Sequence, residues 1–282
     1  MQIRAGFKKE WLQFTRTFRL GGVLLSVLGF AVAEPLMLWG LNALLSLGMS
    51  ASVEAAGTAG MDMGSLLGLP GLSMAEMYFS TNMAEFCTTS MLIIMLVLMS
   101  PCGGEQKKRA TIIPSCTGLG YYEYLVPKFV IYPVTVFLTG FAGCCISGAL
   151  NNAINDGESV STGFILLAAF MCAVYMSFIF VVYMAVGICT SRPGVVTAAM
   201  YVGVSLVQMI LTGLNLTDYH PLTLRSLVSG RMFMPDFVLG DNIANIVVAT
   251  VLSVVIGAMM FILTLTVLKA KKINNQEDKP EF

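Results

Sequence analysis

The chain has 282 residues, of which 56% are hydrophobic and 11% are charged, and its mean hydropathy is +0.80. Soluble domains carry about 25% charged residues, so this composition excludes an ordinary soluble domain and predicts an integral membrane protein. The 16 basic and 16 acidic residues cancel, and no clustered basic excess indicates binding of nucleic acid.

The supply of chemically reactive residues also limits the function. His220 is the single histidine, which leaves little for a zinc site or a histidine-based triad. The seven cysteines show no C-x-x-C spacing, so we expect reduced thiols and neither a disulfide scaffold nor a metal site. No G-x-x-x-x-G-K sequence is present, so we expect no nucleotide site, no directly bound cofactor and no enzymatic activity of the chain itself.

Six apolar stretches are long enough to cross a bilayer, since about 20 helical residues span its hydrocarbon core. They cover about residues 20–47, 83–101, 129–150, 163–190, 195–213 and 243–268. All Lys and Arg residues except Arg225 and Arg231 flank these spans on one side, and the positive-inside rule places that side and both termini in the cytoplasm. The sequence therefore predicts an all-α, multi-pass protein of the plasma membrane, specifically a bacterial cytoplasmic membrane. We expect one membrane domain over residues 1–272 and a flexible cytoplasmic tail over residues 273–282.

The first 33 residues also have features of a cleavable secretory signal, with Ala31-Val32-Ala33 as the cleavage sequence. The apolar run resumes over residues 36–47 and completes a span, so we favour an intact first span.

An amphipathic helix is predicted over residues 1–19, before the first span. Its apolar face carries residues spaced by three or four positions: Ile3, Phe7, Trp11, Phe14 and Phe18. Its other face carries the cations Arg4, Lys8, Lys9, Arg16 and Arg19. This pattern is typical of a helix in the cytoplasmic interface of a lipid bilayer, with rings toward acyl chains and cations toward headgroups.

Two segments between spans are too long for simple turns. Residues 102–128 are polar and basic and are interrupted by Pro114, so we expect a short helix, a break and a second short helical piece over residues 121–126. This segment is either a docking site for a soluble partner or only a retention signal. On the outer side, residues 215–242 mix apolar runs with Pro221 and Pro235, which predicts a re-entrant or interfacial pair of short helices before the last span.

Glu34 lies inside the first span beside Pro35, where a carboxylate is unfavourable unless it is neutralised or paired. It faces the substrate path or a dimer interface, couples to a proton, or is a protonated acid beside a kink. Glu85 is expected near the outer boundary. Arg225 and Arg231 either meet an anion at the outer exit or pair with loop acids, for which the candidates are Asp218, Asp236 and Asp241.

Together these segments resemble the permease subunit of a type-2 ABC exporter. Glu34-Pro35-Leu36-Met37 resembles the E-P-L-L pattern of these permeases, and residues 105–128 resemble their E-x-x-x-G-T and E-Y-x-x-x-K coupling segment. His220-Pro221-Leu222-Thr223, followed by Arg231, resembles their N-P-L-T stretch with a later Arg. Two departures are Arg109-Ala110-Thr111, without the usual glycine, and His220, where Asn is common.

The resemblance implies pairing with a second permease copy or a homologous permease, and with ATPase subunits that bind ATP and magnesium. Closure of the ATPase subunits would press on a coupling helix and open the path outward for a hydrophobic or amphipathic substrate, such as a drug, a peptide, a lipid or a lipid-linked glycan. The expected coupling residues are Glu105, Lys107, Lys108, Arg109, Tyr122, Glu123, Tyr124 and Lys128. The expected path or gate residues are Glu34, Pro35, His220, Arg225 and Arg231.

The main alternative is a secondary transporter or channel that uses Glu34 as a coupling acid. The two halves of the chain show no inverted repeat, which argues against it. An intramembrane enzyme is weaker still, because no Ser or Asp constellation accompanies His220.

Overall fold

A computed structural model describes residues 2–56, 73–104, 120–155, 159–190, 192–214, 216, 218–234 and 237–277. Within these ranges every regular element is a helix. Six helical stretches are long and apolar enough to cross a membrane: Arg19–Gly40, Ala75–Val97, Tyr121–Ile154, Thr162–Thr190, Pro193–Gly213 and Leu239–Ala270. The prediction of a helical, multi-pass membrane protein is confirmed.

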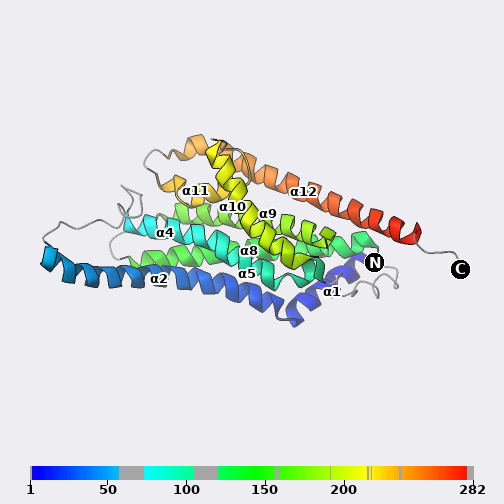
Figure 1. Ribbon diagram of the computed structural model, residues 1–282, viewed down its shortest axis with the longest axis horizontal. Coiled ribbons are helices and arrows are strands. Elements are labelled where there is room, and N and C mark those ends of the chain that lie inside the picture. The colour runs from blue at the N-terminus through cyan, green and yellow to red at the C-terminus, as the bar shows by residue number, and fades with distance from the viewer. Residues whose placement is uncertain are drawn as a thin grey trace.

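The helices form one elongated bundle (Figure 1). In chain order they are α1 (Gln2–Arg16), α2 (Arg19–Ala56), α4 (Met74–Glu85), the π-helical turn η1 (Phe86–Ser90), α5 (Met91–Val97), the kinked turn η2 (Ser100–Gly104), α8 (Tyr121–Ile154), α9 (Thr162–Thr190), α10 (Pro193–Gly213), α11 (Thr223–Val228), the 3-10 turn η3 (Arg231–Phe233) and α12 (Leu239–Glu277). Helix α1 and the last turns of α12 lie at one end, here called the α1 end, and α11 lies at the other, the α11 end.

Helix α9 is the centre of the bundle. In its most apolar window 56% of the residues are buried, against 11% in α10 and 17% in α12. Helices α8, α10, α11 and α12 all pack on α9. Apolar residues dominate the exposed surfaces of α10 and α12, which suits helices that face lipid.

The second span begins eight residues earlier than predicted, at Ala75. Its start is fixed by a capping box, in which the Ser73 hydroxyl accepts from the Glu76 N–H and the Glu76 carboxylate accepts from the Ser73 N–H. Glu85 consequently lies near the middle of the span, and its expected place at the outer boundary is wrong.

Two further boundaries differ from the predictions. Helix α8 starts at Tyr121 and continues through Pro127 and Pro133, so the separate short helix over residues 121–126 is wrong. Pro127 lacks the N–H that would bond to the Glu123 carbonyl, and the α1 backbone packs against this carbonyl at Gly6, where a Cβ would come within 2.6 Å of the oxygen. Helix α12 continues to Glu277, so the first five residues of the predicted tail are helical.

Helix α1 forms where it is predicted, but only some of its aromatic side chains face outward, and the others are buried against the protein. Phe14 is fully buried, and its ring centroid lies 5.2 Å from that of Tyr132. Phe7 also packs against the core. Trp11 and Phe18 remain exposed, as do Arg4, Lys8 and Arg16, and are free to meet a membrane interface. The helix is therefore docked on the protein through part of the stripe that was predicted to face lipid.

Candidate functional site

A buried group of charged and polar side chains joins α1 to α8 at the α1 end. Lys128 Nζ lies 3.6 Å from Glu10 Oε2, and the Tyr132 hydroxyl donates to the same oxygen at 3.2 Å. Lys128 is 0% exposed and Glu10 is 2% exposed. Buried charges persist in a fold where they are paired and hydrogen-bonded. We refer to Glu10, Lys128 and Tyr132 as the charge cluster.

The charge cluster also joins the two flanks of the cytoplasmic segment considered above. Lys128 Nζ donates to the Pro101 carbonyl at 3.3 Å, which connects α8 to η2. The same ammonium lies 4.7 Å from the centroid of the Tyr124 ring, within range of a cation–π interaction. One buried lysine of α8 therefore connects the element that precedes residues 105–119 to the helix that follows them.

A close backbone contact and a second polar link reinforce η2. Gly103 has φ +117°, and a Cβ there would collide with the Gly187 carbonyl of α9, so only glycine fits. Arg19, predicted as an interfacial cation, donates instead from Nη2 to the Ser100 hydroxyl at 3.0 Å. Helices α1, α2, α8 and α9 are thus all connected at η2 or through Lys128.

The predicted coupling residues have different surroundings. Glu105, Lys107, Lys108 and Arg109 lie outside the described residues. Tyr122 is exposed on the first turn of α8, with its ring centroid 6.3 Å from that of Phe261 of α12. Glu123 and Tyr124 are half-buried. Lys128 is inside the protein, so it braces the segment and offers no surface for a partner to touch.

Unpaired polar groups lie deep in the bundle. Glu34, 6% exposed in α2, has no hydrogen-bond partner for Oε2 within the described structure, and α2 runs continuously through Pro35. Helix α2 packs on α4 and η1, and Glu85, exposed at the junction of these two elements, accepts from the Thr89 hydroxyl at 3.2 Å. The sequence alone placed no second acid near Glu34, because Glu85 belongs to another span.

At the α11 end, the predicted gate residues form local contacts. Arg231 pairs with Asp218 at 3.1 Å on the surface. His220 Nε2 lies 2.9 Å from the Leu216 carbonyl and its Nδ1 accepts from the Thr223 N–H, so the ring caps the start of α11. Arg225 points into the bundle and donates to Gln208 of α10 at 2.8 Å. Arg225 is therefore turned away from the predicted outer anion site.

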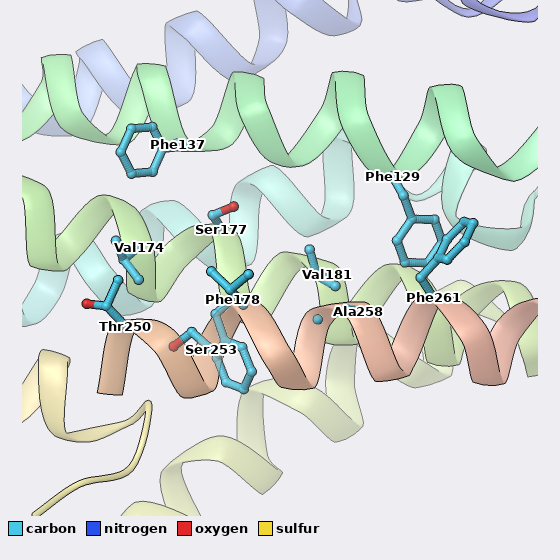
Figure 2. Close-up of a pocket in the computed structure, with 12 residues that line it drawn as sticks. Phe129, Phe137, Val174, Ser177, Phe178, Val181, Thr250, Ser253, Ala258 and Phe261 are labelled. Atoms are coloured by element: carbon cyan, nitrogen blue, oxygen red, sulfur yellow. The ribbon is translucent and has the colours of Figure 1, made fainter. Parts of the chain in front are cut away.

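An apolar groove of about 440 Å³ runs between α8, α9 and α12. Figure 2 shows Phe129 and Phe261 side by side toward one end and Thr250 near the other, with Phe178 between them. Three hydroxyls line the groove: Ser177 donates to the Pro133 carbonyl, Ser253 to the Ala249 carbonyl, and Thr250 Oγ1 has no partner within the described residues. Such a surface suits an apolar molecule with few polar atoms.

The groove was not predicted, although one signal was readable. Thr250, Ser253 and Gly257 interrupt the apolar run of the last span at helical spacing, which marks one face of α12 as different from the rest. Among the described residues, no group of three or more His, Cys, Asp or Glu side chains is placed to hold a metal ion.

The fold and these sites define a helical membrane protein with a braced polar end and a lateral apolar groove. No protein-family model, curated protein or solved structure matches the chain.

Proposed function

We propose that this chain is the permease subunit of an ATP-driven exporter of the type-2 ABC class. It would act with a second permease and with separate ATPase subunits that carry ATP and magnesium. The observation that carries the proposal is the charge cluster, because it connects both flanks of the expected coupling segment to α1, α8 and η2.

The coupling mechanism follows from this connection. A partner that pushes on residues 105–119 displaces the Pro101 carbonyl on one flank and α8 on the other. Because Lys128 is bonded to both Pro101 and Glu10, the displacement passes to α1 and to the whole length of α8. These residues transmit force and take part in no bond-making chemistry.

The transported molecule would be hydrophobic or amphipathic. The groove is lined mainly by Phe and Val side chains and opens on the side of the bundle. A substrate can therefore enter from the bilayer, and a tilt of α12 relative to α8 and α9 would change the width of the groove.

A proton-driven transporter is the second candidate, and the buried Glu34 carboxyl, whose Oε2 has no partner within the described residues, favours it. Ionisable residues inside membrane spans are common in the proton relays of transporters. In that case substrate movement would follow a pH gradient and would need no ATPase subunit.

The test is co-expression with a candidate ABC ATPase subunit from the same genome, followed by affinity purification. The variants Glu105→Lys and Arg109→Glu reverse charges at two of the expected coupling residues. Lys269→Glu is the matched control, because it reverses an exposed charge on α12 at the α1 end of the bundle. We expect a stable complex with the wild-type chain and with the control, and at least a tenfold loss of bound ATPase with Glu105→Lys and with Arg109→Glu. Equal recovery of the ATPase with all three variants, or none with the wild type, would reject the proposal.

A further inference from the structure

A column of sulfur-containing side chains runs along the buried face of the second span. Met83, Cys87, Met91 and Met95 recur every four residues, and each is at most 3% exposed. Helix α9 contributes Cys172 and Met176, both fully buried. Cys87 Sγ lies 3.1 Å from Cys172 Sγ, and Cys172 Sγ lies 3.7 Å from Met176 Sδ. We refer to Cys87, Cys172 and Met176 as the sulfur cluster.

A small void adjoins the sulfur cluster. It measures about 30 Å³, and four of the residues that line it carry sulfur: Cys87, Met91, Met95 and Met200. Its lining does not include Cys172 or Met176, so the void adjoins the sulfur cluster on the Cys87 side and does not itself contain the three sulfurs. Cys87 also lies in the π-helical turn η1, and such turns inside α-helical segments are frequent at functional sites.

Thiolate and thioether ligands select soft monovalent ions over hard divalent ones. We propose that Cys87, Cys172 and Met176 form a binding site for a soft monovalent cation, with Cu(I) or Ag(I) as the matching ions. One ion would replace the two thiol protons, which pass to water, and the resulting bis-thiolate complex would carry one negative charge.

The charges around the sulfur cluster act in opposite directions. Arg225 lines the same void as Cys87, and its guanidinium would offset the negative charge of the complex. The carboxyl of Glu34 also acts on Cys87 and Cys172, and its ionised form would oppose the complex. The proposed role of Arg225, which does not face the outer loop, is therefore to balance the charge of the bound complex.

The geometry needs a small adjustment to admit an ion. A first-row metal lies about 2.3 Å from a thiolate sulfur, so three sulfurs around one ion stand about 4 Å apart. The distance between Cys172 and Met176 is close to this value, and the two thiols must separate by about 1 Å. The thioether of Met176 supplies the third ligand of the cluster, and the fully buried thiol of Cys144 on α8, which also interacts with Cys172, is a further candidate ligand.

The inference does not depend on the proposed export function, because the site lies within a single chain. The experiment is anaerobic titration of the purified full-length protein in detergent with Cu(I), in competition with a Cu(I) chelator. We expect one Cu(I) per wild-type chain and a higher melting temperature in its presence. The double variant Cys87→Ser/Cys172→Ser should lose affinity by more than about 100-fold, and Met176→Leu by about tenfold.

Cys145→Ser is the matched control, because this cysteine lies on α8 outside the cluster and is half-buried. It should bind Cu(I) like the wild type. If the double variant does not fold, Met176→Leu still decides, since exchange of Met for Leu preserves side-chain volume. The proposal is wrong if the wild type binds no Cu(I), if Met176→Leu and the folded double variant bind it as tightly as the wild type, or if Cys87 and Cys172 are joined by a disulfide in the purified protein.

Discussion

The α1 end and the groove side of the bundle are stabilised in different ways. At the α1 end, a buried ion pair, hydrogen bonds to η2 and a backbone contact between Gly103 and Gly187 connect four helices. Along the groove, α12 contacts α8 and α9 through apolar side chains, and few of its residues are buried. From this difference we expect α1, η2 and the start of α8 to move as one unit, and α12 to shift relative to α8 and α9 during transport.

The largest effect is expected when the positive charge of Lys128 is removed from the α1 end. Lys128→Met leaves the buried Glu10 carboxylate with Lys9, 3.6 Å from Oε1, as its remaining cationic partner, so the free energy of unfolding should fall by at most about 3 kcal/mol, the lower end of the cost of breaking a buried ion pair. Thermal unfolding in detergent measures the effect. Glu10→Gln/Lys128→Met removes both charges and should recover more than half of the loss, whereas a double variant as unstable as the single one would show that the pair does not stabilise the α1 end.

Gly103→Ala tests the backbone contact at the same end. The added Cβ collides with the Gly187 carbonyl, and the positive φ disfavours alanine, so we expect a loss of about 3 kcal/mol. Gly29→Ala in α2 is the control, because a Cβ at Gly29 meets nothing within 4 Å. Similar melting temperatures for the two variants would contradict the tight approach of η2 to α9.

On the groove side, a larger side chain should alter binding more than stability. Gly257→Leu places a side chain in the groove, where the nearest atom to the new Cβ is Val181 Cγ1 at 3.6 Å. We expect the unfolding free energy to change by less than about 1 kcal/mol and the affinity for a hydrophobic fluorescent dye to fall about tenfold. Fluorescence titration measures the affinity, and Gly29→Leu should leave it unchanged.

The smallest effect is expected at the α11 end. The side chains of the Arg231–Asp218 pair are 43% and 42% exposed, so this is a surface ion pair. Asp218→Asn should therefore change the unfolding free energy by less than about 1 kcal/mol. A loss comparable to that of Lys128→Met would mean that the α11 end is braced as firmly as the α1 end.

The spans were predictable because hydropathy depends on local composition, but the residues that connect them were not. Glu10 is the single acid in a basic leader, and its role depends on Lys128, more than 100 residues later in the chain. The early start of the second span was readable in the Ser73 and Glu76 capping pattern, yet the polar Asn82 and Glu85 hid it from a hydropathy window. The pairing of Arg231 with Asp218 was among the predicted alternatives.

The burial of only part of the aromatic stripe on α1 also depends on contacts between residues far apart in the sequence. Helical spacing shows that Phe7, Trp11 and Phe14 share a face, but it does not distinguish a lipid surface from the side of another helix. Phe14 is buried because it packs against Tyr132, and this contact depends on the packing of α1 on α8, which the sequence does not reveal. The π-helical turn η1 left no readable pattern in the sequence, whereas the kink at η2 falls at Pro101 and the Gly103-Gly104 pair.

The most direct test of the central claim is transport by the reconstituted protein. Vesicles that contain the chain together with its ATPase should move a hydrophobic fluorescent dye when ATP and magnesium are supplied on the ATPase side, and vesicles with the chain alone should not. The Lys128→Met variant should bind the ATPase and hydrolyse ATP without moving the dye, if it folds. Dye movement by the chain alone, driven by a pH gradient and lost in Glu34→Gln, would contradict the ABC permease and establish the proton-driven transporter.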